Sequence, residues 1–189
     1  MDTTLSQALI GNRSVLSQIA LIVGGSLLIG LAAQVSVPML PVPMTLQTLA
    51  ISIIALAYGS RLAAATLVAY LVEGAVGLPV FADASFGLAK LVGPTAGYLW
   101  GFVAMAWLTG YMVEHGFGRG LVRLFAAALI PAALLFVPGV IVLKLVLAMD
   151  WPSAMAAGVT PFLIGGLVKA ALAALVVAGG WAAVKNRAV

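Results

Sequence analysis

Long stretches without a charged residue constrain this chain more than any other feature of its sequence. No charged side chain lies between Arg13 and Arg61. Further uncharged runs cover residues 91–113, 124–143, 151–168 and 170–184. Because a helix needs about 20 apolar residues to cross the hydrocarbon core of a bilayer, the sequence predicts several membrane-spanning helices.

The composition excludes whole classes of protein. Of all residues, 64% are hydrophobic and 7% are charged, whereas a soluble domain is roughly half apolar and about one quarter charged. A soluble enzyme, a nucleic-acid-binding domain and a disordered segment are therefore excluded. The chain has no cysteine and one histidine, which excludes disulfides and sites built from thiolates or from several histidines. We expect no metal and no cofactor.

The expected fold class is an all-α integral membrane protein with six transmembrane helices in a single domain covering residues 1–189. The predicted spans are residues 15–34, 45–58, 62–76, 94–113, 124–149 and 161–184. The second and third are short, and one long helix over residues 44–76 is the alternative. We favour two helices, because one helix would place Arg61 inside the bilayer at a cost of about 2.5–3.5 kcal/mol.

Prolines and loops set the remaining boundaries. Three prolines in residues 38–43 cannot continue the first helix, since each lacks an N–H. Pro131 and Pro138 are expected to bend the fifth span. Residues 153–159 are expected to form a short helix near the membrane surface.

The basic residues indicate how the chain is oriented. With six spans, both termini lie on one side of the membrane. On the other side, Lys90 is the single basic residue expected in the loops. The basic residues on the side of the termini are Arg13, Arg61, Arg119, Arg123, Lys185 and Arg187. The positive-inside rule therefore places both termini in the cytoplasm.

A few polar side chains in or beside the predicted spans are candidates for a small-molecule site. Ionisable residues within a bilayer are costly and commonly functional. Gln47, Glu73, Lys90 and Lys169 all fall toward the outer leaflet. Aromatic walls could come from Phe81, Phe86, Tyr98, Trp100 and Phe162. The alternatives are snorkelling of the lysines to the headgroups, interhelical hydrogen bonds of the glutamine, and packing of the aromatic rings.

Catalysis is not indicated. His115 lies in a loop with no nucleophile partnered to it, and the glycines of residues 116–120 lack the Lys-Ser/Thr of a phosphate-binding loop. We expect a protein that is not an enzyme and has no ATPase motif of its own.

Four sequence blocks stand out: AQ and PMLPVPMTLQTL at residues 33–34 and 38–49, GLPVFA at 77–82, GPTAGYLWGF at 93–102 and PFLIGGLVK at 161–169. Together they resemble the BioY family, the biotin-specific S components of energy-coupling factor (ECF) transporters. The resemblance implies an S-component fold with an outward-facing biotin pocket. It also implies a bacterial inner (cell) membrane protein that works with a transmembrane coupling subunit and two cytoplasmic ATPase subunits.

The resemblance also assigns residues. It implies that Lys169 contacts substrate, and that Ala20 and Gly24 in the first helix dock the coupling subunit. The family carries an aspartate three residues before this lysine, where this chain has Gly166. We expect biotin to bind more weakly here than to a Gly166→Asp variant.

Function is thus expected to be high-affinity capture and membrane transport of biotin. An S component for another vitamin and a non-transporting membrane scaffold are the alternatives. A homo-oligomer is also compatible with the sequence.

Overall fold

The computed structural model describes residues 3–11 and 14–187 and is mostly helical. In these ranges the α-helices are α1 Leu5–Ile10, α2 Val15–Gln34, α3 Gln47–Tyr58, α4 Ser60–Ala75, α5 Ala96–Met112, α6 Leu121–Leu134, α7 Phe136–Val146, α8 Trp151–Gly158 and α9 Phe162–Arg187. The other elements are strands β1 Ser36–Val37 and β2 Met44–Thr45, the 3-10 turns η1 Ala82–Ala84 and η2 Leu88–Leu91, and the π-helical turn η3 Val113–Phe117.

The break between the second and third predicted helices is confirmed. α3 and α4 are separate helices that meet at Gly59, whose φ of 86° lies in the left-handed region that favours glycine. The amide of Ser60, at the start of α4, donates to the Glu114 carboxylate at 2.8 Å. This contact fixes the turn to the segment that follows α5.

The fifth predicted span is divided at Leu135 into α6 and α7. Pro138 lacks an N–H, so the carbonyl of Leu134 loses its usual helical donor. α8 is the short helix expected after this span. Asp150 caps it by accepting a hydrogen bond from the Ser153 amide at 3.0 Å, and hydrogen bonding from Ser153 lowers the pKa of this carboxyl.

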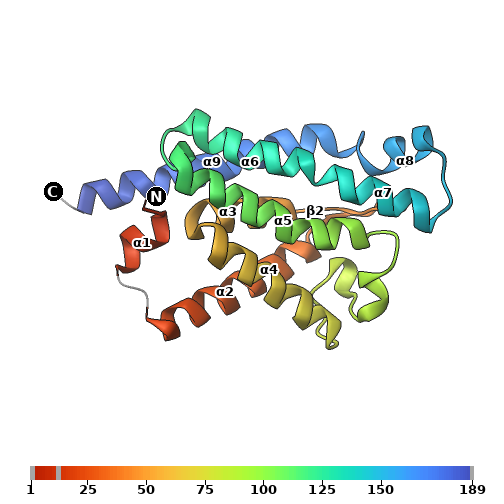
Figure 1. Cartoon of the computed structure of the whole chain (residues 1–189), viewed down its shortest axis with the longest axis horizontal. Helices are drawn as coiled ribbons and strands as arrows, with labels where there is room; N and C mark the ends of the chain where they lie inside the picture. The colour runs from red at the N-terminus through yellow and green to blue at the C-terminus, as the bar shows by residue number, and fades with distance from the viewer. Residues whose placement is uncertain (1–2, 12–13, 188–189) are drawn as a thin grey trace.

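Three tiers of helices are visible in Figure 1, with α2 and α4 in one, α3 and α5 in the middle, and α6, α7 and α9 in the third. α3 packs against both α5 and α9, and α6 packs along α9. β1 and β2 form an antiparallel hairpin in which Ser36 pairs with Thr45. The hairpin leads the chain from the first tier to the start of α3.

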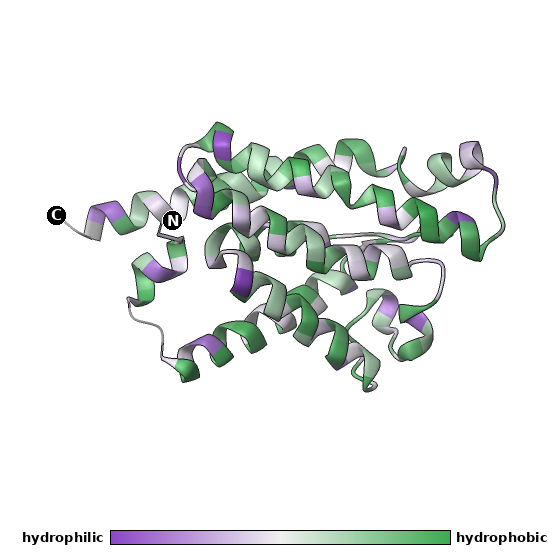
Figure 2. Cartoon of the chain, viewed as in Figure 1, coloured by the Kyte–Doolittle hydropathy of each residue, from purple (hydrophilic) through white to green (hydrophobic). Residues whose placement is uncertain are grey.

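Hydrophobic residues make up most of the length of the helices (Figure 2), and many of their large apolar side chains are exposed. Four helical stretches in the described ranges are long and apolar enough to cross a membrane, at Val15–Gln34, Ala96–Phe117, Leu121–Val146 and Trp151–Asn186. The exposed face of α2 carries Leu16 and Leu31, which are 77% and 69% exposed. This is a multi-pass membrane protein. α3 and α4 are shorter, at 12 and 16 residues, and the count of six crossings stays a prediction.

Both ends of the chain lie at one end of the molecule (Figure 1), here called the terminal end. Arg119 donates to the Thr3 hydroxyl at 3.4 Å there, and its guanidinium lies 3.3 Å from the centre of a Trp181 ring. Lys90, in η2, lies on the loop between α4 and α5. Arg13 lies outside the described residues, as does the side chain of Arg187.

Candidate functional site

A cavity of about 550 Å³ lies between α3, α5, α6 and α9. The loop of residues 39–43 and the segment around η1 also line it. Ligand pockets in proteins commonly measure about 300–1,000 Å³, so the cavity has the size of a small-molecule site. Its walls are mostly apolar, with a few polar groups among them.

Seven of the eight predicted binding residues line this cavity. They are Gln47, Phe81, Lys90, Tyr98, Phe162, Gly166 and Lys169. Residues far apart in sequence are therefore gathered around one space. Whether each contacts a ligand stays a prediction.

Glu73 is the exception and lies outside the cavity. Its carboxylate accepts a hydrogen bond from the Ser26 hydroxyl of α2 at 2.6 Å. At about 3.6 residues per turn, Glu73 is rotated by about 60° around α4 from Tyr70, which faces α3. The sequence predicted which end of its helix Glu73 lies at. It could not predict that the side chain faces α2 rather than the cavity.

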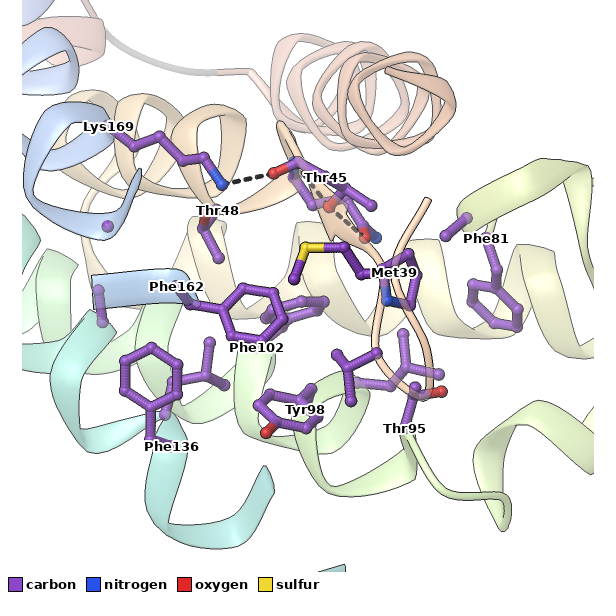
Figure 3. A pocket seen from close by; sticks show the side chains of 18 of the residues that line it. Met39, Thr45, Thr48, Phe81, Thr95, Tyr98, Phe102, Phe136, Phe162 and Lys169 are labelled. Atoms are coloured by element: carbon purple, nitrogen blue, oxygen red, sulfur yellow. Dashed lines mark hydrogen bonds between the residues drawn. The ribbon is translucent and has the colours of Figure 1, made fainter. Parts of the chain in front are cut away.

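Lys169 points from α9 toward the start of α3 (Figure 3). Its ammonium donates to the carbonyl oxygen of Thr45 at 2.6 Å. No carboxylate contacts it in the part of the chain that the structure describes. The lysine thus points to a backbone carbonyl within the protein, and two of its three N–H donors have no partner in the described residues.

Gln47 is buried and belongs to a chain of hydrogen bonds. Its side-chain amide donates to the Tyr70 hydroxyl at 2.6 Å and accepts from the Thr45 hydroxyl at 2.8 Å. Tyr70 in turn donates to the carbonyl of Val80 at 3.0 Å. The network fixes β2 and the segment before η1 around the cavity. Tyr70 was missed in the sequence, because nothing in its local pattern shows which helix its hydroxyl faces.

Aromatic rings form much of the wall. The Tyr98 hydroxyl donates to the carbonyl of Gly158 at 2.7 Å, which anchors α8 to α5. The Phe162 ring lies 6.3 Å from that of Phe136, and Phe102 faces the same space (Figure 3). Sequence reasoning missed Phe136 and Phe102, since an aromatic residue inside an apolar helix carries no signal of its own.

Two other aromatic candidates point away from the cavity. Phe86 is 57% exposed and Trp100 is 56% exposed. The Trp100 indole N–H donates to the carbonyl of Leu91 at 3.0 Å. Both lie outside the cavity lining.

The ionised groups of the lining differ in burial. Lys90 is exposed at the rim, near the loops, while Lys169 is half-buried. Asp83 is exposed and accepts a hydrogen bond from the Ser36 hydroxyl at 3.0 Å. Two cations against one anion give the cavity an excess positive charge, which favours a ligand with a negative end.

Gly166 leaves open space beside Lys169. A Cβ at this position would meet no heavy atom within 4 Å. One turn of α9 therefore has room for a larger side chain at the cavity surface.

The two residues predicted to dock a partner lie on a bare face of α2. Ala20 and Gly24 are exposed, and a Cβ on Gly24 would meet nothing within 4 Å. Gly25, Ser26 and Gly30 are instead buried within the bundle.

Comparisons with known proteins agree with this architecture. The family model described as "BioY family" matches residues 3–186. The biotin transporter BioY2 of Lactococcus lactis is 32% identical over 157 residues, which cover 83% of this chain and 86% of the relative. The biotin transporter BioY of Thermotoga maritima is 34% identical over 149 residues, covering 79% of this chain and 86% of the relative.

A solved structure shares the fold. The crystal structure of the S-component for biotin from an ECF-type ABC transporter matches with a TM-score of 0.73 and covers 88% of this chain and 93% of that chain. The two sequences are 19% identical, so this likeness concerns the fold alone.

Proposed function

This chain belongs to the BioY family, and we propose that it captures biotin and carries it across the membrane as the substrate-specific subunit of an ECF transporter. The observation that carries the proposal is the cavity beside α3 and α9, with Lys169 directed toward it. Biotin presents a cyclic urea, a thioether ring, an apolar tail and a carboxylate. The cavity offers hydrogen-bonding groups, aromatic walls and positive charge to match them.

The two lysines suggest how the ligand is oriented. A carboxylate is costly to remove from water, so we propose that the biotin carboxylate stays near the exposed Lys90 at the rim. The ring system then lies deeper, against Tyr98, Phe102 and Phe162. There the Lys169 ammonium can donate to the urea oxygen.

Energy for transport is proposed to come from partner subunits. The exposed small residues Ala20 and Gly24 allow a second helix to approach the α2 backbone closely, which suits docking of a transmembrane coupling subunit. Two cytoplasmic ATPase subunits would complete the assembly. We propose that the protein resides in the bacterial cell membrane and binds biotin from outside.

Labelling tests the orientation. The chain has no cysteine, so a single introduced thiol can be labelled selectively. We expect His115→Cys, near the terminal end, to react with an impermeant maleimide only after cells are opened. Phe86→Cys, on the opposite loop, should react in intact cells. The reverse pattern would contradict the proposed orientation.

A ligand panel tests the function. The purified protein is titrated with radiolabelled biotin, thiamine and riboflavin. The proposal predicts saturable binding of biotin alone. Binding of another vitamin would indicate a different substrate, and binding of none would indicate a scaffold. Biotin uptake by cells with and without the partner subunits then tests the source of energy.

A further inference from the structure

Three hydroxyl-bearing residues line up on the cavity face of α3 and the strand before it. Thr45, Thr48 and Ser52 are spaced three and four residues apart and all line the cavity. This spacing places helical side chains on one face. Thr48 points into the space near Phe162 (Figure 3).

The hydroxyls of Thr48 and Ser52 have no hydrogen-bond partner among residues 3–11 and 14–187. Thr66, which lies outside the cavity, donates to the carbonyl of Leu62 at 2.8 Å. The Thr109 hydroxyl, also outside the cavity, is buried without a partner in the described residues, so the position of Thr48 and Ser52 on the cavity wall is what distinguishes them. Ser52 is only 2% exposed. Thr48 is half-buried. A buried hydroxyl without a partner costs free energy, and both hydroxyls are free to bond to a ligand inside the cavity.

The facing side of α9 offers donors and no side-chain acceptor. Gly166, Lys169 and Ala170 line the cavity there, and the lysine ammonium can only donate. A cyclic urea has one acceptor oxygen and two N–H donors. Lys169 suits the oxygen, while the N–H groups need acceptors from another element.

The other side-chain acceptors of the lining are placed differently. The Gln47 side-chain oxygen already accepts from Thr45, Asp83 is exposed and accepts from Ser36, and Thr95 lies just before α5. Building on the proposed function, we propose that Thr48 and Ser52 are specificity-determining residues that accept the N–H groups of the biotin urea. They take the part that a carboxylate at position 166 would play.

Conservative variants test this assignment. Calorimetry with biotin is run on the full-length protein and on Thr48→Val, Thr48→Ser, Ser52→Ala and the Thr48→Val/Ser52→Ala double variant. Loss of one hydrogen bond predicts about 3- to 10-fold weaker binding for each hydroxyl removed. Thr48→Ser keeps the hydroxyl and should bind like the parent. Thr109→Val is the matched control, since Thr109 is a buried threonine outside the cavity.

A second background separates ligand contact from packing. In Gly166→Asp protein the new carboxylate supplies an acceptor, so removing both α3 hydroxyls should cost less than in the parent. A purely structural role of the hydroxyls predicts equal losses in both backgrounds, which would overturn the inference.

The remaining outcomes are also decisive. Biotin binding that is unchanged in Thr48→Val and in Ser52→Ala would contradict the inference and leave the proposed function standing. No biotin binding by the parent protein would contradict both. Should Ser52→Ala fail to fold, the contrast between Thr48→Val and Thr48→Ser decides the matter.

Discussion

At the terminal end the helices touch backbone to backbone, whereas farther along the bundle the space beside α3 and α9 is a cavity. A Cβ on Gly110 of α5 would overlap the backbone of Gly59 and Ser60. A Cβ on Gly166 would meet nothing within 4 Å. The same residue type thus permits close packing in one region and leaves open volume in the other.

Polar groups differ between the two regions in the same way. At the terminal end both oxygens of Glu114 accept hydrogen bonds from Ser60, at 2.8 Å from its amide and 2.7 Å from its hydroxyl. Around the cavity, Lys169 uses one donor on Thr45. Glu114 thus has both oxygens engaged in holding α4 to the segment after α5, whereas Lys169 keeps N–H donors that a ligand in the cavity can use.

The two glycines give the largest expected contrast. Gly110→Ala should abolish accumulation of folded protein, because the new methyl group overlaps backbone that cannot move independently. Gly166→Ala should fold normally, and Ala in place of Gly in a helix favours folding by up to about 1 kcal/mol. Size-exclusion profiles and thermal unfolding in detergent measure both. Normal folding of Gly110→Ala would refute the tight contact.

Lys169 and Lys144 sharpen the comparison for binding. Removing a buried charged partner of a ligand costs about 2–5 kcal/mol, so Lys169→Ala should weaken biotin binding by at least about 30-fold. Lys144 lies outside the cavity, with its ammonium 5.3 Å from the centre of a Trp151 ring, and Lys144→Ala should change affinity by less than about 2-fold. Titration calorimetry measures both affinities. A larger loss from Lys144→Ala than from Lys169→Ala would contradict the assignment of the biotin site to this cavity.

Gly166→Asp places a hydrogen-bond acceptor in the open space beside Lys169. A hydrogen bond that involves a charged group contributes about 1.5–3 kcal/mol, so biotin should bind at least about 10-fold more tightly. Gly166→Asn, which adds a neutral side chain of similar size, is the control and should gain less. Equal affinities of the parent and the aspartate variant would contradict the expectation that the absence of the family's aspartate at position 166 weakens biotin binding.

Glu114→Ala tests the packing at the terminal end. Two donors of Ser60 lose their acceptor, and leaving such groups unsatisfied costs about 1–3 kcal/mol. Glu114→Gln keeps one acceptor oxygen and should lose less. Thermal unfolding measures the change, while biotin affinity of the folded protein should stay constant. A fall in affinity without a fall in stability would show that the two regions are not independent.

Lys90→Gln is expected to have the smallest effect. Exposed ion pairs contribute about 0–1 kcal/mol, so biotin affinity should fall by less than about 5-fold. The loss should shrink further at high salt. A loss as large as that of Lys169→Ala would place the carboxylate in a more buried contact than proposed.

Much of the fold could be predicted because charges and prolines punctuate an apolar sequence. The range of α2 agrees with the expected residues 15–34, and Gly59 divides α3 from α4 as expected. α1 was not predicted, since it has only six residues and depends on local capping by Thr4 and Gln7. Its position against α3 also comes from tertiary contact: Ser6 donates to the carbonyl of Ala57 at 2.7 Å.

The site was only partly predictable for a related reason. Polar residues such as Lys169 and Gln47 stand out in apolar helices, which makes them visible in sequence. The sequence also gives the depth of Glu73, but not the helix it faces. Thr48 and Ser52 resemble ordinary helical residues in the sequence, and only the structure shows that their hydroxyls have no partner in the part of the chain that it describes.

A structure of the purified protein with biotin tests the central claim most directly. The account predicts biotin in the cavity beside α3 and α9, with its urea oxygen within hydrogen-bond distance of the Lys169 ammonium and its carboxylate toward Lys90. Biotin bound at another surface, with the cavity unoccupied, would contradict it.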